Sequence, residues 1–158
     1  LTKANAAICA QNKMDMFVTV WMGILELSTG RLCCANAGHE YPAIGKNGSG
    51  FALYKDKHGF VIGGMPGMKY TDYTIKLEPG AKLFVYTDGV PEAERADREQ
   101  FGLERTLTVL RRFEDLPPQS IVTGMSTAVY DFVGDIPQFD DLTMLVLHYK
   151  GFTPDGQN

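Results

Sequence analysis

Apolar and polar positions along the chain predict a sheet-rich domain with a few helices. Residues 16–27 are apolar almost throughout and rich in strand-forming types, so we expect a strand there that is covered on both faces. Residues 28–30, Ser-Thr-Gly, supply a turn, and residues 31–38 follow as the return strand of a hairpin. The apolar run at residues 83–87 predicts another buried strand, and residues 142–149 predict a last apolar strand.

Helical spacing of apolar residues appears in three places. The Ala-rich residues 1–13 predict a first helix, and the Leu residues between 103 and 110 predict a second. The face expected to pack in the third helix is formed by Ile121, Met125, Val129 and Phe132. With six or so strands and short connections, the pattern predicts an α+β fold, a mostly antiparallel β-sandwich with flanking helices. In this interpretation the core includes Trp21, Met22 and Cys33.

Composition narrows the class of protein. The 158 residues suit one domain, which we place at residues 1–150 with a tail at 151–158. The 15 basic and 19 acidic residues give a net charge of −4, which argues against nucleic-acid binding. No apolar run approaches the roughly 18 residues of a membrane span. Cys9, Cys33 and Cys34 lack metal or redox spacing, so we interpret them as small buried hydrophobes in a reducing cytoplasm.

The dipeptide Asp88-Gly89 has two interpretations. Asp-Gly is a common hairpin turn, but here it is followed by Val-Pro-Glu-Ala-Glu and a charged loop instead of a return strand. Asp140 and Asp141 precede the last predicted strand. If that strand pairs antiparallel with residues 83–87, the carboxylates converge, and a hard cation such as Mg²⁺ or Mn²⁺ would offset their repulsion. The alternative is that Asp88 turns a loop and Asp140 caps it, with no ion.

Four segments in this order carry a resemblance to a known family. They are MFVTVWMGILELSTGRLCCANAGHEYPAI, LFVYTDGVPEAE, FGLERTL and FDDLTMLVL. Together they resemble the metal-dependent protein phosphatases of the protein phosphatase 2C-like superfamily, and most closely the bacterial sporulation stage II protein E type. The resemblance covers about residues 1–150, which would correspond to the C-terminal portion of a single phosphatase domain of this family and to part of its fold.

The resemblance implies a four-layer α/β/β/α sandwich with two divalent cations, Mn²⁺ or Mg²⁺, at one edge of the sheets. It implies that Asp88 and Asp140 are metal ligands. It also gives supporting roles to Gly89, to Asp141 as a hydrogen-bonding group, and to His39. For His39 we favour a turn-forming histidine at the strand end over a general acid. The reaction it implies is hydrolysis of a phosphoserine or phosphothreonine by metal-activated water, with no protein nucleophile.

By the same resemblance, the substrate would be a phosphorylated anti-sigma-factor antagonist in a bacterial signalling pathway. A longer protein could add an N-terminal sensor or membrane region. The family's GD-V-x-G-x-G segment has no counterpart here, so we expect an incomplete metal centre, little activity of the isolated chain, and a homodimer that covers exposed apolar surface. The alternatives are a non-catalytic pseudo-phosphatase or partner-binding module, and an unrelated β-sandwich binding domain.

Overall fold

The computed structural model describes residues 1–46, 48–137 and 140–153, which form two compact units. The first unit consists of Leu1–His39, Lys55–Leu77 and the start of Gly151–Asn158. The second unit consists of Glu40–Tyr54 and Glu78–Lys150. Residues 138 and 139 of the Phe-Asp-Asp-Leu-Thr region, and 154–158 of the expected tail, lie outside the described residues.

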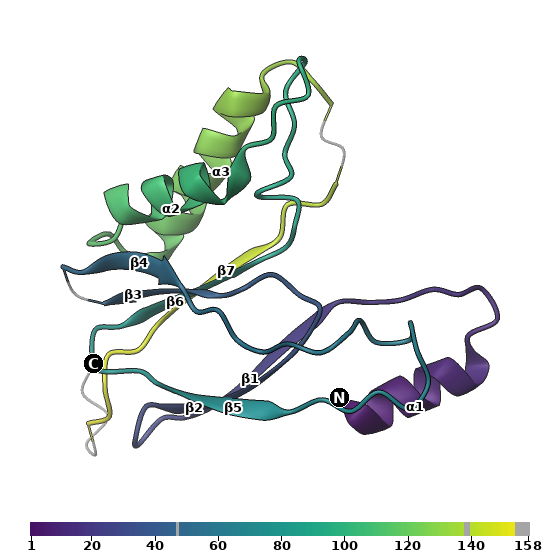
Figure 1. The fold of residues 1–158 in the computed structure, drawn as a ribbon. Helices are drawn as coiled ribbons and strands as arrows, with labels where there is room; N and C mark the ends of the chain where they lie inside the picture. Colours follow the sequence, from purple (N-terminus) through teal and green to yellow (C-terminus); the bar gives the residue numbers. More distant parts are fainter. Residues whose placement is uncertain (47, 138–139, 154–158) are drawn as a thin grey trace. The chain divides into compact units, whose positions relative to one another are not determined.

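The first unit contains a three-stranded antiparallel sheet and one helix (Figure 1). The sheet has the order β1-β2-β5, with β1 at Val20–Glu26, β2 at Arg31–Ala37 and β5 at Asp72–Lys76. The predicted hairpin is confirmed, because β1 pairs with β2 and the Gly30 amide donates to the Glu26 carbonyl oxygen at 2.8 Å. The helix α1 spans Thr2–Gln11, as expected from its sequence.

A buried asparagine ties α1 to the Gly-rich segment of the same unit. Asn5 is 1% exposed, and its Nδ2 donates to the Met65 carbonyl oxygen at 3.0 Å. Its Oδ1 accepts from the Gly63 amide at 2.9 Å. Both ends of the amide are therefore satisfied, as a buried polar group requires.

The prediction of a strand covered on both faces is wrong for β1. Met22 is 47% exposed and Ile24 62% exposed, so Met22 is not a core residue, and Trp21 is only half-buried. In β2, Cys34 is buried whereas Cys33 is half-buried, because adjacent strand residues point to opposite faces. Cys9 is also half-buried, so the expectation of three buried cysteines holds for Cys34 alone.

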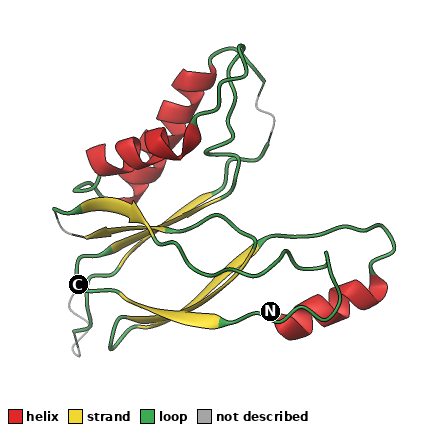
Figure 2. Cartoon of the chain, in the orientation of Figure 1, coloured by secondary structure: helices red, strands yellow, loops and turns green. Residues whose placement is uncertain are grey.

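The second unit has a four-stranded antiparallel sheet with two helices on one face (Figures 1 and 2). Its strand order is β4-β3-β6-β7. The strands are β3 (Ala43–Lys46), β4 (Gly50–Leu53), β6 (Lys82–Tyr86) and β7 (Met144–His148), and the helices are α2 (Gly102–Arg112) and α3 (Pro118–Val133).

The core of the second unit lies between this sheet and the helices. Phe84 and Tyr86 of β6 stack with ring centroids 5.2 Å apart. Opposite them, the predicted face of α3 is confirmed, since Ile121, Met125 and Val129 are all buried. Leu83, Phe84 and Tyr86 of β6 are buried, as its continuous apolar run predicted.

The α+β class is confirmed. The described residues contain seven strands in two antiparallel sheets, together with three helices. None of these helices, over the part of the chain that the structure describes, is long and apolar enough to cross a membrane.

Candidate active site

The expected convergence of acidic segments follows from how β6 and β7 pair. They are antiparallel, with Lys82 opposite His148 and Tyr86 opposite Met144. The pairing continues one step past the sheet, where the Thr87 amide donates to the Thr143 carbonyl oxygen at 3.0 Å. The end of β6 therefore lies beside the start of β7, and Asp88 and the Asp140-Asp141 pair extend from the same edge.

The Thr87 hydroxyl fixes the two segments to each other. Its Oγ1 donates to the Asp141 carbonyl oxygen at 3.0 Å and accepts from the Thr143 amide at 3.2 Å. Both partners of the hydroxyl are main-chain groups rather than the carboxylates. Thr87 thus sets the spacing of the backbone that carries Asp88 and Asp141.

The acidic side chains at this edge are exposed, whereas the backbone beneath them is ordered by turns. The Asp88 carbonyl oxygen accepts from the Glu92 amide at 2.8 Å, and the Val90 amide donates to the Thr87 carbonyl oxygen at 3.1 Å. Asp140 Oδ1 accepts from the Asp141 amide at 2.7 Å. Asp88, Asp140 and Asp141 are all exposed, and among the described residues Asp88 and Asp141 have no cationic side chain within ion-pair distance.

Gly89 is buried between these segments. A Cβ built on it would lie 2.5 Å from the Asp141 carbonyl oxygen and 3.1 Å from the Asp141 carbonyl carbon. No other residue type fits at this position without moving the Asp141 backbone. The close approach explains a glycine directly after Asp88.

The donor chemistry at this edge suits a hard divalent cation. Carboxylate oxygens are the ligands that Mg²⁺ and Mn²⁺ prefer, and Mg²⁺ typically keeps several waters while binding one or two carboxylates. Within the described residues, however, no group of three or more His, Cys, Asp or Glu side chains could hold a metal ion. Asp88 and Asp140 therefore fit the chemistry of the implied ions but offer a small ligand set.

The Asn36–His39 turn follows β2 in the first unit. The Asn36 side chain bonds both main-chain groups of His39: Oδ1 accepts from the amide at 2.8 Å, and Nδ2 donates to the carbonyl oxygen at 3.0 Å. Gly38 takes a φ of 70°, which favours glycine. His39 Nδ1 lies 3.1 Å from Thr19 Oγ1. The turn-forming part of the expectation for His39 is confirmed, and its role in a metal site stays a prediction.

A buried carboxylate that the sequence analysis did not single out supports this turn. The Asp56 side chain has no exposed surface, and it accepts from Asn36 Nδ2 at 3.2 Å. It also accepts from the Tyr73 hydroxyl and lies 3.2 Å from His58 Nδ1. Trp21 Nε1 donates to the Tyr73 hydroxyl at 2.9 Å. These polar groups come from distant parts of the sequence, so no local motif marks them.

Known proteins can now be compared with this chain. A family model described as Stage II sporulation protein E (SpoIIE) matches residues 1–150. The chain belongs to the SpoIIE family. The curated protein IcfG of Synechocystis sp. is 33% identical to it over 135 residues, which cover 85% of this chain and 21% of IcfG. The chain thus spans about a fifth of that relative.

Solved structures share the fold of this SpoIIE-family chain. The RsbU and RsbW domains of Rv1364c from Mycobacterium tuberculosis superpose with a TM-score of 0.79 at 17% identity, covering 94% of this chain and 42% of that one. The phosphatase domain of SpoIIE from Bacillus subtilis, presoaked with Mn, gives 0.63 at 18% identity, covering 86% and 58%. The chain therefore carries the fold of a protein phosphatase 2C-type domain.

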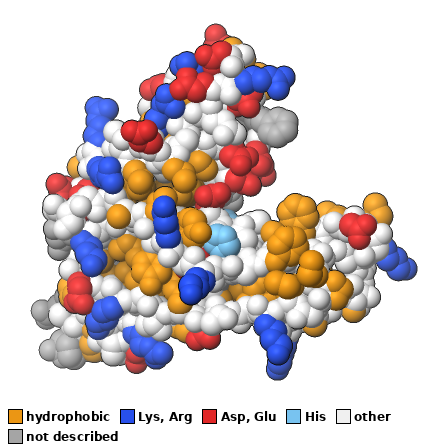
Figure 3. Space-filling view, in the orientation of Figure 1, with side chains coloured by type: hydrophobic (Ala, Val, Ile, Leu, Met, Phe, Trp, Pro, Cys, Tyr) orange, Lys and Arg blue, Asp and Glu red, His pale blue; other side chains and the backbone are white. Residues whose placement is uncertain are grey.

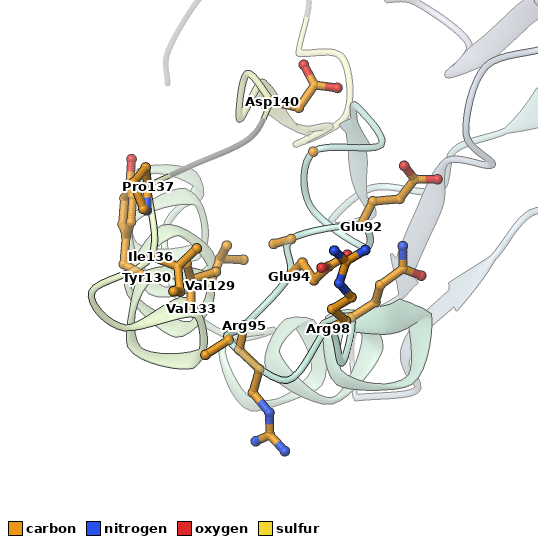
Figure 4. A pocket seen from close by; sticks show the side chains of 14 residues that line it. Glu92, Glu94, Arg95, Arg98, Val129, Tyr130, Val133, Ile136, Pro137 and Asp140 are labelled. Carbon is orange, nitrogen blue, oxygen red and sulfur yellow. The ribbon is translucent and has the colours of Figure 1, made fainter.

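The second unit of the SpoIIE-family chain also has a cavity that sequence reasoning missed. It has a volume of about 540 Å³ and is bordered by Gly89 and Asp140 (Figure 4). The available signal was the apolar face of the third predicted helix, which continues past Val129 to Val133, with Ile136 following soon after the helix.

Proposed function

We propose that this chain supplies the Asp88 and Asp140 side of the active site of a metal-dependent protein serine/threonine phosphatase. The observation that carries the proposal is the pairing of β6 with β7, because it brings Asp88 and the Asp140-Asp141 pair to one sheet edge in an exposed position. The family and the fold support a phosphatase. The specificity for phosphoserine and phosphothreonine is part of the proposal.

Each residue at the edge has a defined task in this proposal. Asp88 and Asp140 would hold two divalent cations, Mn²⁺ or Mg²⁺, which supply a water of lowered pKa and offset charge on the phosphoryl oxygens. Gly89 lets the Asp88 turn approach the Asp141 backbone, and Thr87 holds that backbone in place. Asp141 orients Asp140 through the bond from its amide to Asp140 Oδ1. His39 keeps the supporting role expected from the family.

The substrate in this proposal is a phosphorylated regulatory protein of the bacterial cytoplasm, an anti-sigma-factor antagonist. The similar Bacillus subtilis structure is described as the phosphatase domain of a cell fate determinant, which supports a regulatory protein as the target. A free metabolite is the less suitable substrate, because the carboxylates lie on an open edge where a protein surface can approach.

The deciding experiment compares variants of the longest natural protein that contains this chain. We expect Mn²⁺-dependent hydrolysis of p-nitrophenyl phosphate and of a phosphoserine protein, and Asp88→Asn should reduce kcat by at least a hundredfold. Asp115→Asn is the matched control, since Asp115 is an exposed carboxylate away from the β6–β7 edge. Full activity of Asp88→Asn would exclude the assignment of Asp88 as a ligand.

A second candidate function is a non-catalytic module. It is favoured by one observation, that the described residues hold no group of three or more potential metal ligands. On this ground we also expect the isolated 158-residue chain to be inactive. An upstream Gly-Asp segment of the family type in the natural protein would favour the enzyme. Its absence, together with no Mn²⁺-dependent hydrolysis, would favour the pseudo-phosphatase.

We further propose that the isolated chain forms a homodimer through the first unit. Figure 3 shows hydrophobic side chains gathered around α1 and the segment that follows it. Met14 is 80% exposed, Met16 71% and Phe17 65%, which is unusual for a monomer surface. Light scattering should give twice the mass of 17.4 kDa, and Phe17→Glu should return the chain to a monomer. A wild-type monomer at micromolar concentration would contradict this proposal.

A further inference from the structure

The cavity beside the β6–β7 edge lies entirely within the second unit. We call it the α3 cleft and define it by its apolar wall and its polar rim. The wall is formed by Val129, Tyr130, Val133, Ile136 and Pro137. The rim is formed by Glu92, Glu94, Arg95, Arg98 and Gln100. Its volume of about 540 Å³ falls within the range of roughly 300–1,000 Å³ that is typical of ligand sites.

The apolar wall exists because the core-facing side of α3 continues beyond the core. Val129 is 3% exposed and packs in the hydrophobic core, and Val133 lies one turn later on the same side of the helix. The helix ends at Val133 and is capped by Gly134, whose φ is 68°, and Ile136 follows with 41% of its surface exposed. Exposed apolar side chains at the edge of a cavity are what an apolar ligand group requires.

The rim is a small, braced hairpin. Glu94 and Gln100 form an antiparallel bridge, and the Arg95 amide donates to the Glu99 carbonyl oxygen at 3.1 Å. The Arg95 guanidinium also pairs with Asp97 and Glu99, and Figure 4 shows its side chain directed away from the other labelled residues. In the part of the chain that the structure describes, the Arg98 guanidinium has no ion-pair partner.

The cleft continues to the carboxylate edge, because Gly89 and Asp140 are among its lining residues. A group held in the cleft would therefore lie next to the residues that we propose as the metal-binding edge. The lining residues carry three carboxylates and two guanidinium groups, of which that of Arg95 points away, so the cleft offers no attraction to a polyanion such as a nucleic acid. Polar groups of both signs around an apolar wall suit a polypeptide, whose main chain both donates and accepts hydrogen bonds.

We propose that the α3 cleft binds the polypeptide segment next to the phosphorylated residue of the substrate. One apolar side chain of that segment packs against Val133 and Ile136, and its main chain bonds the polar rim. This inference rests on the proposed phosphatase function and deepens it, because it assigns the recognition of sequence to a surface separate from the carboxylates. It predicts a preference for phosphopeptides that have a leucine-like residue near the phosphoserine.

The test uses the longest natural protein that contains this chain and a set of synthetic phosphoserine peptides. Members of the set place one Leu at each of the two positions before and after phosphoserine in a Gly/Ser background. We expect one position to lower KM about tenfold relative to the peptide without Leu, which is the effect of burying part of one Leu side chain. Ile136→Ser should abolish that preference while leaving kcat/KM for p-nitrophenyl phosphate unchanged.

Leu116→Ser is the matched control, since Leu116 is also 41% exposed but does not line the cleft. A wild-type protein with equal KM for all peptides, or an Ile136→Ser variant that keeps the Leu preference, would overturn the inference. Fluorescence polarisation of labelled peptides gives a second readout that does not need turnover. If the wild type hydrolyses no phosphoester, the proposed function fails, and loss of the Leu-dependent binding in Ile136→Ser still decides whether the cleft binds peptide.

Discussion

The Cα atom of Gly89 lies so close to Asp141 that a Cβ at residue 89 would be 2.5 Å from the Asp141 carbonyl oxygen. That oxygen also accepts the hydrogen bond from Thr87 Oγ1. The two segments that carry the proposed metal ligands are therefore held by backbone contacts rather than by the carboxylates themselves. The Asp88 and Asp141 carboxylates take no part in these contacts and are exposed.

Gly89→Ala should separate these segments. The new methyl group would force the Asp141 backbone away, and we expect a loss of about 1–3 kcal/mol in the free energy of unfolding. Urea denaturation of the isolated chain measures the loss. Gly67→Ala is the control, because open space surrounds Gly67 and only its positive φ, at a cost of about 1 kcal/mol, opposes a Cβ, so Gly89→Ala should lose more. Equal losses in the two variants would show that the contact with Asp141 does not constrain residue 89.

Thr87→Val should destabilise the same edge by a different route. Valine keeps the shape of threonine but removes the donor to the Asp141 carbonyl oxygen and the acceptor for the Thr143 amide. We expect a loss of about 1–2 kcal/mol in urea denaturation. Thr87→Ser retains the hydroxyl and should lose less than half as much. If Thr87→Val and Thr87→Ser lower the free energy of unfolding equally, the hydrogen bonds of the hydroxyl do not stabilise this edge.

The sequence predicted this edge because antiparallel pairing follows a simple geometric rule. Once residues 83–87 and 142–149 are taken as neighbouring strands, the end of one lies beside the start of the other, and Asp88 must approach Asp141. The apolar run of β6 was informative for the same reason. A strand buried on both faces needs apolar residues on both, and Leu83 is buried on one face while Phe84 and Tyr86 are buried on the other.

The errors arose where the outcome depends on distant partners. The apolar run that contains Met22 was taken for core, yet nothing in a run shows whether a second layer covers it, and Met22 is 47% exposed. The Asp56 network was not predicted because its polar groups come from Asn36, Tyr73 and Trp21, which have no fixed spacing. The α3 cleft depends on where a helix ends relative to a hairpin, which no periodicity encodes.

Asp56→Asn should loosen the Asn36–His39 turn. The amide cannot accept from Tyr73, Asn36 and His58 as the carboxylate does, so a fully buried group would lose bonds, and we expect a loss of about 1–3 kcal/mol. Urea denaturation gives the magnitude, and faster exchange of the His39 amide locates the effect. Asp72→Asn, at an exposed carboxylate of the same unit, should change neither the free energy of unfolding nor the exchange rate of the His39 amide. An unchanged exchange rate of the His39 amide would show that Asp56 does not stabilise the turn.

Tyr86→Phe should stabilise the chain. The Tyr86 hydroxyl is the one buried side-chain polar atom, within the described residues, that has no hydrogen-bond partner. Removing it should raise the free energy of unfolding at pH 7 by about 1 kcal/mol. Tyr130→Phe, at a residue 54% exposed, is the control and should be neutral. A loss of stability in Tyr86→Phe would mean that the hydroxyl is satisfied in solution.

The same variant should reduce the sensitivity of the protein to alkali. Burial, with a smaller effect from Glu40, raises the pKa of Tyr86, so the unfolded chain loses this proton at lower pH than the folded one. The contribution of the protonated Tyr86 hydroxyl to the free energy of unfolding is therefore complete below about pH 10 and falls as the pH rises above that value. Burial also raises the pKa of Cys34 to about 12, so the free energy of unfolding should begin to decline from about pH 9. Tyr86→Phe should make the decline above pH 10 less steep and leave the earlier part, while Tyr73, whose pKa burial also raises, maintains a decline above pH 10.

Arg98→Gly should stabilise the hairpin that forms the rim of the α3 cleft. Arg98 has a φ of 66°, and its amide donates to the Arg95 carbonyl oxygen at 2.8 Å, which closes a tight turn. A residue with a Cβ is strained in this region by about 1 kcal/mol, whereas glycine enters it freely. We expect a gain of about that size in urea denaturation for Arg98→Gly. Arg98→Ala is the control, since it removes the same guanidinium but keeps the strain. If Arg98→Gly is no more stable than Arg98→Ala, the positive φ of this residue carries no cost.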